Sequence, residues 1–144
     1  MTEKFKQELN ERRKNRRKFY GEDFTPLELV NEMLSKLPNE VWEPEKLWID
    51  PAGGNGNFVV EVLKRKLEKG HEPLQALLTI FSIEILQDNV DEMKSRLLSA
   101  LPDLDDTQRA KAIGILNHNI VCADALTWDY ENWCPLHKTA KPLF

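Results

Sequence analysis

The fold of this chain is decided by a glycine-rich stretch at residues 50–58, which reads Asp-Pro-Ala-Gly-Gly-Asn-Gly-Asn-Phe. A short apolar run at residues 47–49 precedes the stretch, and an apolar pattern of helical period follows it. The sequence therefore predicts a strand, a glycine loop and the start of a helix. Glycines let the backbone turn sharply and approach a ligand closely. Asp50, at the end of the strand, can accept hydrogen bonds from hydroxyl or ammonium donors.

The order of the glycines separates this loop from two common nucleotide-binding loops. Gly54 and Gly56 are not followed by the third glycine of the dinucleotide fingerprint. A phosphate-binding loop needs Gly-Lys followed by Ser or Thr, and the chain has no such run. A tight strand-to-helix turn without a ligand stays open as an alternative.

Strands and helices alternate along the rest of the chain. The patterns predict strands at residues 46–50, 79–85 and 119–123, and helices at residues 57–69, 73–78, 87–101 and 105–116. This alternation favours a parallel sheet with right-handed crossovers. We therefore predict an α/β, Rossmann-like fold of about three strands with flanking helices, in a core of residues 39–144.

A helical arm at residues 1–38 is predicted to precede this core. Its second helix is expected to begin with Thr25 as the N-cap, Pro26 in the first helical position and Glu28 completing a capping box. Residues 1–18 carry eight basic and three acidic side chains, although the whole chain has a net charge of −4. This basic arm is interpreted either as a contact to nucleic acid phosphates or as a solvated leader helix.

Composition narrows the class of protein. The 144 residues correspond to one domain. The two cysteines, at no zinc-binding spacing, predict reduced thiols, a cytoplasmic protein and no metal site. No signal peptide is visible, and no apolar run approaches the roughly 20 residues of a membrane helix.

An acidic residue stands within one residue of the end of each predicted strand: Asp50, Glu84 and Asp124. In an open parallel sheet, ligands bind outside the carboxyl ends of the strands. Glu84 interrupts an apolar run, so we expect it to have a hydrogen-bonding partner. A salt bridge or helix cap can explain any one of these acids, whereas the three together indicate a ligand site.

These motifs resemble those of S-adenosylmethionine-dependent methyltransferases, and most closely the amino-group DNA methyltransferases. The glycine loop resembles motif I, in which these enzymes often have Cys where this chain has Gly53. Glu84 with Ile85 resembles motif II, residues 123–126 resemble motif III, and residues 24–26 (Phe-Thr-Pro) resemble motif X. The resemblance spans about residues 16–130. The order X, I, II, III is that of a class in which many members methylate adenine N6.

The resemblance implies a site for S-adenosylmethionine. It assigns the ribose hydroxyls to Glu84, the adenine face to Ile85, the adenine amino group to Asp124 and the methionine moiety to the Asp50 loop. The cofactor-binding residues that it implies are Phe24, Thr25, Asp50, Pro51, Ala52, Gly54, Gly56, Asn57, Phe58, Glu84, Ile85, Asp124 and Ala125.

One family motif is missing. The catalytic Asn/Asp-Pro-Pro-Tyr/Phe, which holds the amino group of a flipped-out base, does not occur in the chain. We therefore predict no catalytic residue, and interpret His118, His137 and Cys134 as ordinary loop residues. The chain is interpreted as the cofactor-binding part, truncated or split, of a DNA adenine-N6 methyltransferase such as those of restriction–modification. The complete enzyme would act on duplex DNA, with a C-terminal catalytic and target-recognition segment or a partner subunit.

Three other functions share parts of this sequence pattern. A non-catalytic S-adenosylmethionine-binding module stays open because the catalytic motif is missing. A nicotinamide dinucleotide enzyme is disfavoured by the absent third glycine. A methyltransferase acting on RNA or on a protein glutamine is disfavoured because the Phe-Thr-Pro element precedes the glycine loop.

Overall fold

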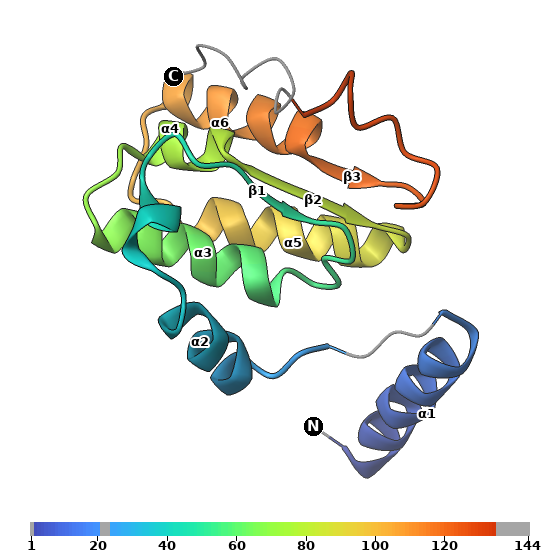
Figure 1. Ribbon diagram of the computed structural model, residues 1–144. Helices are drawn as coiled ribbons and strands as arrows, with labels where there is room; N and C mark the ends of the chain where they lie inside the picture. The colour runs from blue at the N-terminus through green and yellow to red at the C-terminus, as the bar shows by residue number, and fades with distance from the viewer. Residues whose placement is uncertain (1, 21–23, 135–144) are drawn as a thin grey trace.

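A computed structural model of the chain shows an α/β fold built on three parallel strands (Figure 1). The structure describes residues 2–20 and 24–134, with the backbone alone for residues 15–20. The strands are β1 (Trp48–Asp50), β2 (Ile80–Glu84) and β3 (Ile120–Cys122), in the spatial order β1-β2-β3. Ile49 lies opposite Phe81, and Glu84 lies opposite Cys122. The predicted parallel α/β sheet is confirmed.

The helices lie close to their predicted positions. They are α1 (Glu3–Tyr20), α2 (Leu27–Ser35), α3 (Asn57–Glu68), α4 (Pro73–Leu78), α5 (Gln87–Ala100) and α6 (Asp106–Asn119). The segment at residues 39–45, which has no predicted element, contains a short 3-10 helix, η1 (Asn39–Trp42). Gly70 ends α3 with a φ of +87°. The His71 N–H bonds to the Lys66 carbonyl, as in a Schellman motif.

The sheet separates two layers of packing. Strand β2 is buried along its first four residues, so both faces of the sheet are covered there. Because successive side chains of a strand point to opposite faces, they enter two different hydrophobic clusters. Ile80 joins the main core with residues of α3, α4, α5 and α6. Phe81 and Ile83 join a second cluster with Trp133 and Cys134. Helices α3 and α5 run side by side along one face of the sheet (Figure 1).

The start of α2 differs from its prediction. Pro26, rather than Thr25, occupies the N-cap position, and among the described residues no side-chain capping bond forms there, so the predicted capping box is wrong. The physical reason is the backbone of Pro26, whose ψ of 146° is extended rather than helical. Val30 and Leu34 of α2 are buried, whereas Met33 is 46% exposed. None of the described helices is long and apolar enough to cross a membrane.

Candidate functional site

The glycine loop begins directly at the end of β1 and turns back against β2. The Gly53 N–H donates to the Ile83 carbonyl at 2.9 Å, and the Gly56 N–H donates to the Gly53 carbonyl at 3.0 Å. Gly54 and Gly56 have φ values of +56° and +98°, which side-chain-bearing residues rarely adopt. A Cβ on Gly53 would lie 2.0 Å from Ser82 Oγ. A side chain at position 53 would therefore need the side chains of Ser82 and Met93 to shift, whereas backbone conformation favours glycine at positions 54 and 56.

The segment that precedes α2 lies against this loop. A Cβ on Gly54 would lie 2.9 Å from Cδ1 of the Phe24 ring. The Thr25 carbonyl accepts a hydrogen bond of 2.8 Å from the Asn57 side chain. Phe24 and Thr25 are thus brought to the glycine loop from more than 25 residues upstream of it.

Glu84 ends β2 and has the partners that its apolar surroundings predict. Its carboxylate accepts hydrogen bonds from the Gly54 N–H at 3.3 Å, the Leu86 N–H at 2.9 Å and the Asn89 side chain at 3.3 Å. Glu84 therefore joins the strand end directly to the glycine loop. A partly buried carboxylate held in this way can accept further hydrogen bonds from hydroxyl donors.

Asp50 shares the same end of the sheet. Burial raises the pKa of its carboxyl group above the ordinary value, the Ala52 N–H bond at 3.1 Å opposes this shift, and the Glu84 charge adds to it. A carboxylate in this position favours a cationic or hydrogen-bond-donating ligand. Pro51 and Ala52, which follow it, are exposed.

Asp124 lies two residues beyond the end of β3 and is exposed. Its carboxylate accepts a hydrogen bond of 2.9 Å from the Leu126 N–H. The preceding Ala123 N–H bonds to the Glu84 carbonyl at 3.1 Å, which ties the turn to the end of β2. Ile85 is 53% exposed, whereas Ala125 packs against the second hydrophobic cluster.

Two of the predicted site residues make mainly internal contacts. The Asn57 side chain bonds to Thr25 on one side and to Arg96 on the other. Phe58 packs against the main core and lines an apolar groove of about 310 Å³ between α2, β1 and α3. These residues hold the loop in place from within the protein.

Sequence reasoning missed the contribution of α5. Asn89, Met93 and Arg96 all contact the glycine loop or Glu84. Their spacing of four and three residues places them on one helix face. Asn89 and Arg96 are polar residues on the apolar face of α5 that carries Met93, and such residues indicate that the face meets a polar site.

The other candidate residues lie apart from this arrangement. His118 stands in the last turn of α6, so its interpretation as a loop residue is wrong, because the helix continues to Asn119. Its ring contacts the Asn119 side chain at 2.7 Å. Cys134 is buried in the second hydrophobic cluster. His137 lies outside the described residues. Within residues 2–20 and 24–134, no group of three His, Cys, Asp or Glu side chains could hold a metal ion.

Comparison of the chain with protein-family models, with curated proteins and with solved structures finds no match.

Proposed function

We propose that this chain binds S-adenosylmethionine and is the cofactor-binding part of a DNA methyltransferase of the adenine-N6 class. The observation that carries the proposal is the contact between Glu84, at the end of β2, and the glycine loop that follows Asp50. A Rossmann-like methyltransferase sheet is part of this proposal. The order β1-β2-β3 is compatible with one half of a doubly wound sheet, in which the first three strands are also neighbours.

The chemistry of each group suits one part of this cofactor. The Glu84 carboxylate can accept hydrogen bonds from two vicinal ribose hydroxyls. The Asp50 carboxylate, whose pKa is raised by burial, gains from a neighbouring ammonium group such as that of the methionine moiety. The exposed Ile85 offers an apolar surface to the adenine ring, and Asp124 offers an acceptor to its amino group.

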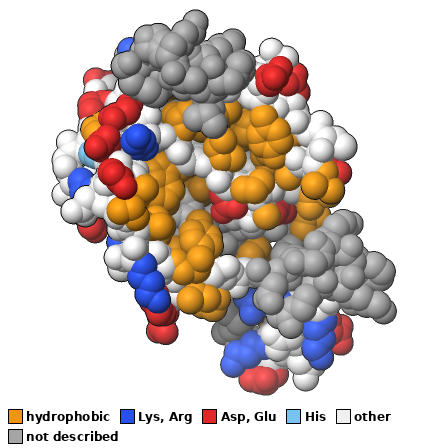
Figure 2. Space-filling model, in the orientation of Figure 1, with side chains coloured by type: hydrophobic (Ala, Val, Ile, Leu, Met, Phe, Trp, Pro, Cys, Tyr) orange, Lys and Arg blue, Asp and Glu red, His pale blue; other side chains and the backbone are white. Residues whose placement is uncertain are grey.

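Methyl transfer to adenine would need residues that this sequence lacks. We propose that a further segment or a partner subunit supplies the motif that holds a flipped-out base of duplex DNA. The edge of the sheet supports this part of the proposal, because among the described strands β1 pairs only with β2. Hydrophobic side chains gather on the face of the molecule that Figure 2 shows. Met33, Leu37 and Ile49, which line the groove between α2, β1 and α3, are 46%, 39% and 37% exposed.

The basic arm supports a contact to DNA phosphates. Helix α1 exposes Arg12, Arg13 and Lys14, and Arg12 also pairs with Asp88 of α5. Affinity that depends on such residues falls steeply with added salt, because counterions are released from the phosphates.

The proposed activity would take place in the cytoplasm.

A non-catalytic S-adenosylmethionine-binding module is the second candidate. The absence of Asn/Asp-Pro-Pro-Tyr/Phe from the sequence favours it for this chain in isolation. Both candidates share the cofactor site and differ only in whether a complementary part restores chemistry.

Calorimetric titration tests the shared site. We expect S-adenosylmethionine and its demethylated product to bind, and NADH not to bind. Binding of NADH without any response to S-adenosylmethionine would refute the proposal.

Methyl transfer separates the two candidates. Tritiated methyl incorporation into unmethylated DNA should be absent with this chain alone and should appear when the catalytic segment of an adenine-N6 enzyme is supplied. Failure of a complete second part to restore transfer would favour the binding module.

A further inference from the structure

Helix α5 carries three side chains that face the candidate site. The Asn89 amide bonds to Glu84. Met93 fills the space beside two glycines, since Cβ atoms on Gly53 and Gly56 would lie 2.7 and 2.8 Å from its side-chain carbons. Arg96, one turn further along, is the charged member of this set. The site therefore rests on one face of a regular helix.

Arg96 makes two hydrogen bonds to the loop from a single nitrogen. Its Nη1 donates to the Asn55 carbonyl at 2.9 Å and to Asn57 Oδ1 at 2.9 Å. That nitrogen carries two hydrogens, so the two bonds form together. The side chain is half-buried, and hydrogen bonds from a guanidinium are stronger than those between neutral groups.

Asn57 extends this contact to the segment before α2. Its Nδ2 donates to the Thr25 carbonyl at 2.8 Å while its Oδ1 accepts from Arg96. A guanidinium only donates and a carbonyl only accepts, so the two neighbours fix the orientation of the amide. The ring of Phe24, next to Thr25, lies over Gly54.

We propose that Arg96 is a positioning residue for this site. It fixes the glycine loop through Asn55, and through Asn57 and Thr25 it holds the Phe24 ring over Gly54. Its effect on cofactor affinity rests on the proposed function, because the loop and the ring would otherwise have to become ordered when S-adenosylmethionine binds. The effect on the free protein does not depend on that function.

Different substitutions test the bonds from Arg96 to the loop and the bond from Asn57 to the Thr25 carbonyl. Arg96→Met keeps most of the aliphatic stem and removes both bonds to the loop. Asn57→Asp keeps an acceptor for Arg96 but replaces the donor to Thr25 with a carboxylate oxygen, which repels the carbonyl. Arg109→Met, at an exposed arginine of α6, is the matched control.

The first measurement uses the free protein. The ring current of Phe24 shifts the nuclear magnetic resonance signals of the Gly54 Hα protons, and Phe24→Leu gives the value without the ring. We expect Arg96→Met and Asn57→Asp to move these signals toward the Phe24→Leu value, and Arg109→Met to leave them unchanged. Unchanged Gly54 signals in Asn57→Asp, or in a folded Arg96→Met, would overturn the proposal.

The second measurement is calorimetric titration with S-adenosylmethionine. Arg96→Met and Asn57→Asp should each weaken binding about tenfold. Arg96→Lys should have a smaller effect, because lysine keeps the charge but lacks the planar guanidinium that places Nη1 between the two oxygens. Wild-type affinity in both variants would overturn the role in binding. If the wild-type protein binds no S-adenosylmethionine, the proposed function fails, and the Gly54 signals still decide whether Arg96 positions Phe24.

Discussion

The two halves of the candidate site are held in place by different kinds of structure. At the ends of β1 and β2, the glycine loop and Glu84 rest on side chains of α5, a regular helix. At the end of β3, Asp124 belongs to an irregular segment of residues 123–134 that packs on the opposite side of the sheet. Trp133 holds this segment by an edge-to-face contact with Phe81 at 5.1 Å and a 2.6 Å bond from its Nε1 to the His118 carbonyl.

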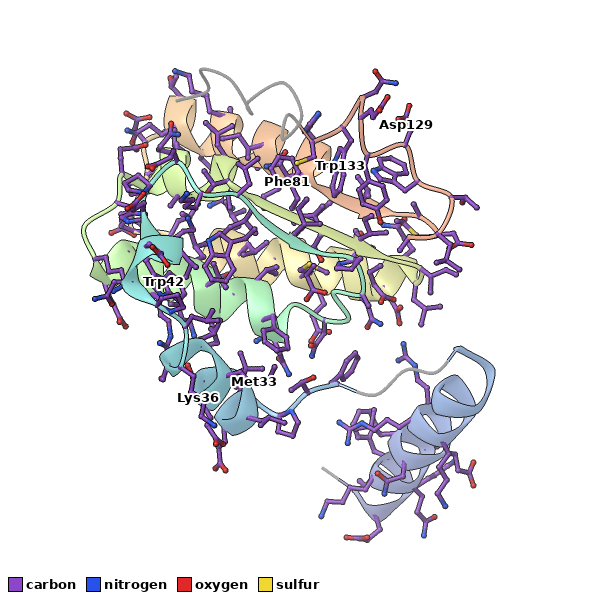
Figure 3. All side chains as sticks on the ribbon, viewed as in Figure 1. Met33, Lys36, Trp42, Phe81, Asp129 and Trp133 are labelled. Atoms are coloured by element: carbon purple, nitrogen blue, oxygen red, sulfur yellow. The ribbon has the colours of Figure 1, made fainter. Side chains whose placement is uncertain are left out.

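The difference has a physical consequence. A helix satisfies its own backbone groups, so the side chains on one face have fixed positions before any ligand arrives. An irregular segment depends on a few large side chains, here the aromatic pair of Phe81 and Trp133 (Figure 3). Substitutions should therefore act on the two halves separately.

Trp133→Ala should release the β3 half. Removing this buried side chain costs about 3–5 kcal/mol, as large-to-small substitutions of tryptophan in cores do. Hydrogen exchange should then be faster at the amides of Thr127 and Cys134, which bond within this segment, and unchanged at Gly53 and Gly56. Trp133→Phe keeps the ring contact but loses the bond to the His118 carbonyl, so it should cost about 1 kcal/mol. Equal loss of protection in both halves would show that they are not independent.

Gly53→Ala should disturb the β1–β2 half. The new methyl group would collide with Ser82 Oγ and Met93 Cε, so overpacking should lower the free energy of unfolding by about 3 kcal/mol. Gly114→Ala is the matched control, because no atom of residues 2–20 or 24–134 lies within 4 Å of a Cβ there. In the middle of α6, that alanine should stabilise the protein by about 0.5–1 kcal/mol. Urea denaturation measures both, and a neutral Gly53→Ala would contradict the close approach at this loop.

Glu84→Gln should weaken S-adenosylmethionine binding about tenfold, because it keeps the shape of the side chain but removes the charge that strengthens hydrogen bonds to hydroxyls. Asp124→Asn, at an exposed position, should have a smaller effect of about threefold, since water competes for the same bond. Glu92→Gln, at an exposed position on α5, should leave the affinity unchanged. Titration calorimetry measures all three variants. A larger effect at Asp124 than at Glu84 would show that the β3 half, rather than the β1–β2 half, contributes more to cofactor affinity.

The pH dependence of binding should report on Asp50. Its raised pKa means that the proton must be lost before the carboxylate can stabilise an ammonium group, so affinity should rise as pH rises through that pKa. In the free protein the sign is opposite. The neutral form is favoured on folding, so this contribution to stability is present at low pH and is lost as pH rises through the same pKa. Asp50→Asn should remove the pH dependence of S-adenosylmethionine affinity in a titration series between about pH 4 and pH 7. If the affinity of that variant depends on pH as in the wild type, another group is responsible.

Local signals explain why much of the fold was predictable. The glycine loop, the Schellman turn at Gly70 and the alternation of strands and helices depend on residues close together in the sequence. Glu84 was expected to have a partner because it interrupts an apolar strand, and the structure supplies three donors.

The predictions that failed depended on contacts between distant segments. Thr25 matches a capping signal, yet its carbonyl is held by Asn57, and Pro26 takes the cap position instead. The exposure of Met33 was also not predictable, because α3 covers only the side of α2 that carries Val30 and Leu34. Sequence periodicity shows that a helix is amphipathic, whereas the neighbouring elements decide how much of its apolar side is covered.

The sequence by itself determined the α/β class, the glycine loop and the acidic residues at the strand ends, because each follows from backbone conformation and the pattern of burial along one segment. Only the tertiary structure decided that Asn89, Met93 and Arg96 support the site, and that Phe24 lies over Gly54. The longest of those contacts, between Arg96 and Asn55, joins residues 41 positions apart. They depend on how α5 packs against the sheet and on where the segment before α2 meets the loop. The spacing of residues within one helix shows which side chains share a face, but not which distant segment that face will meet.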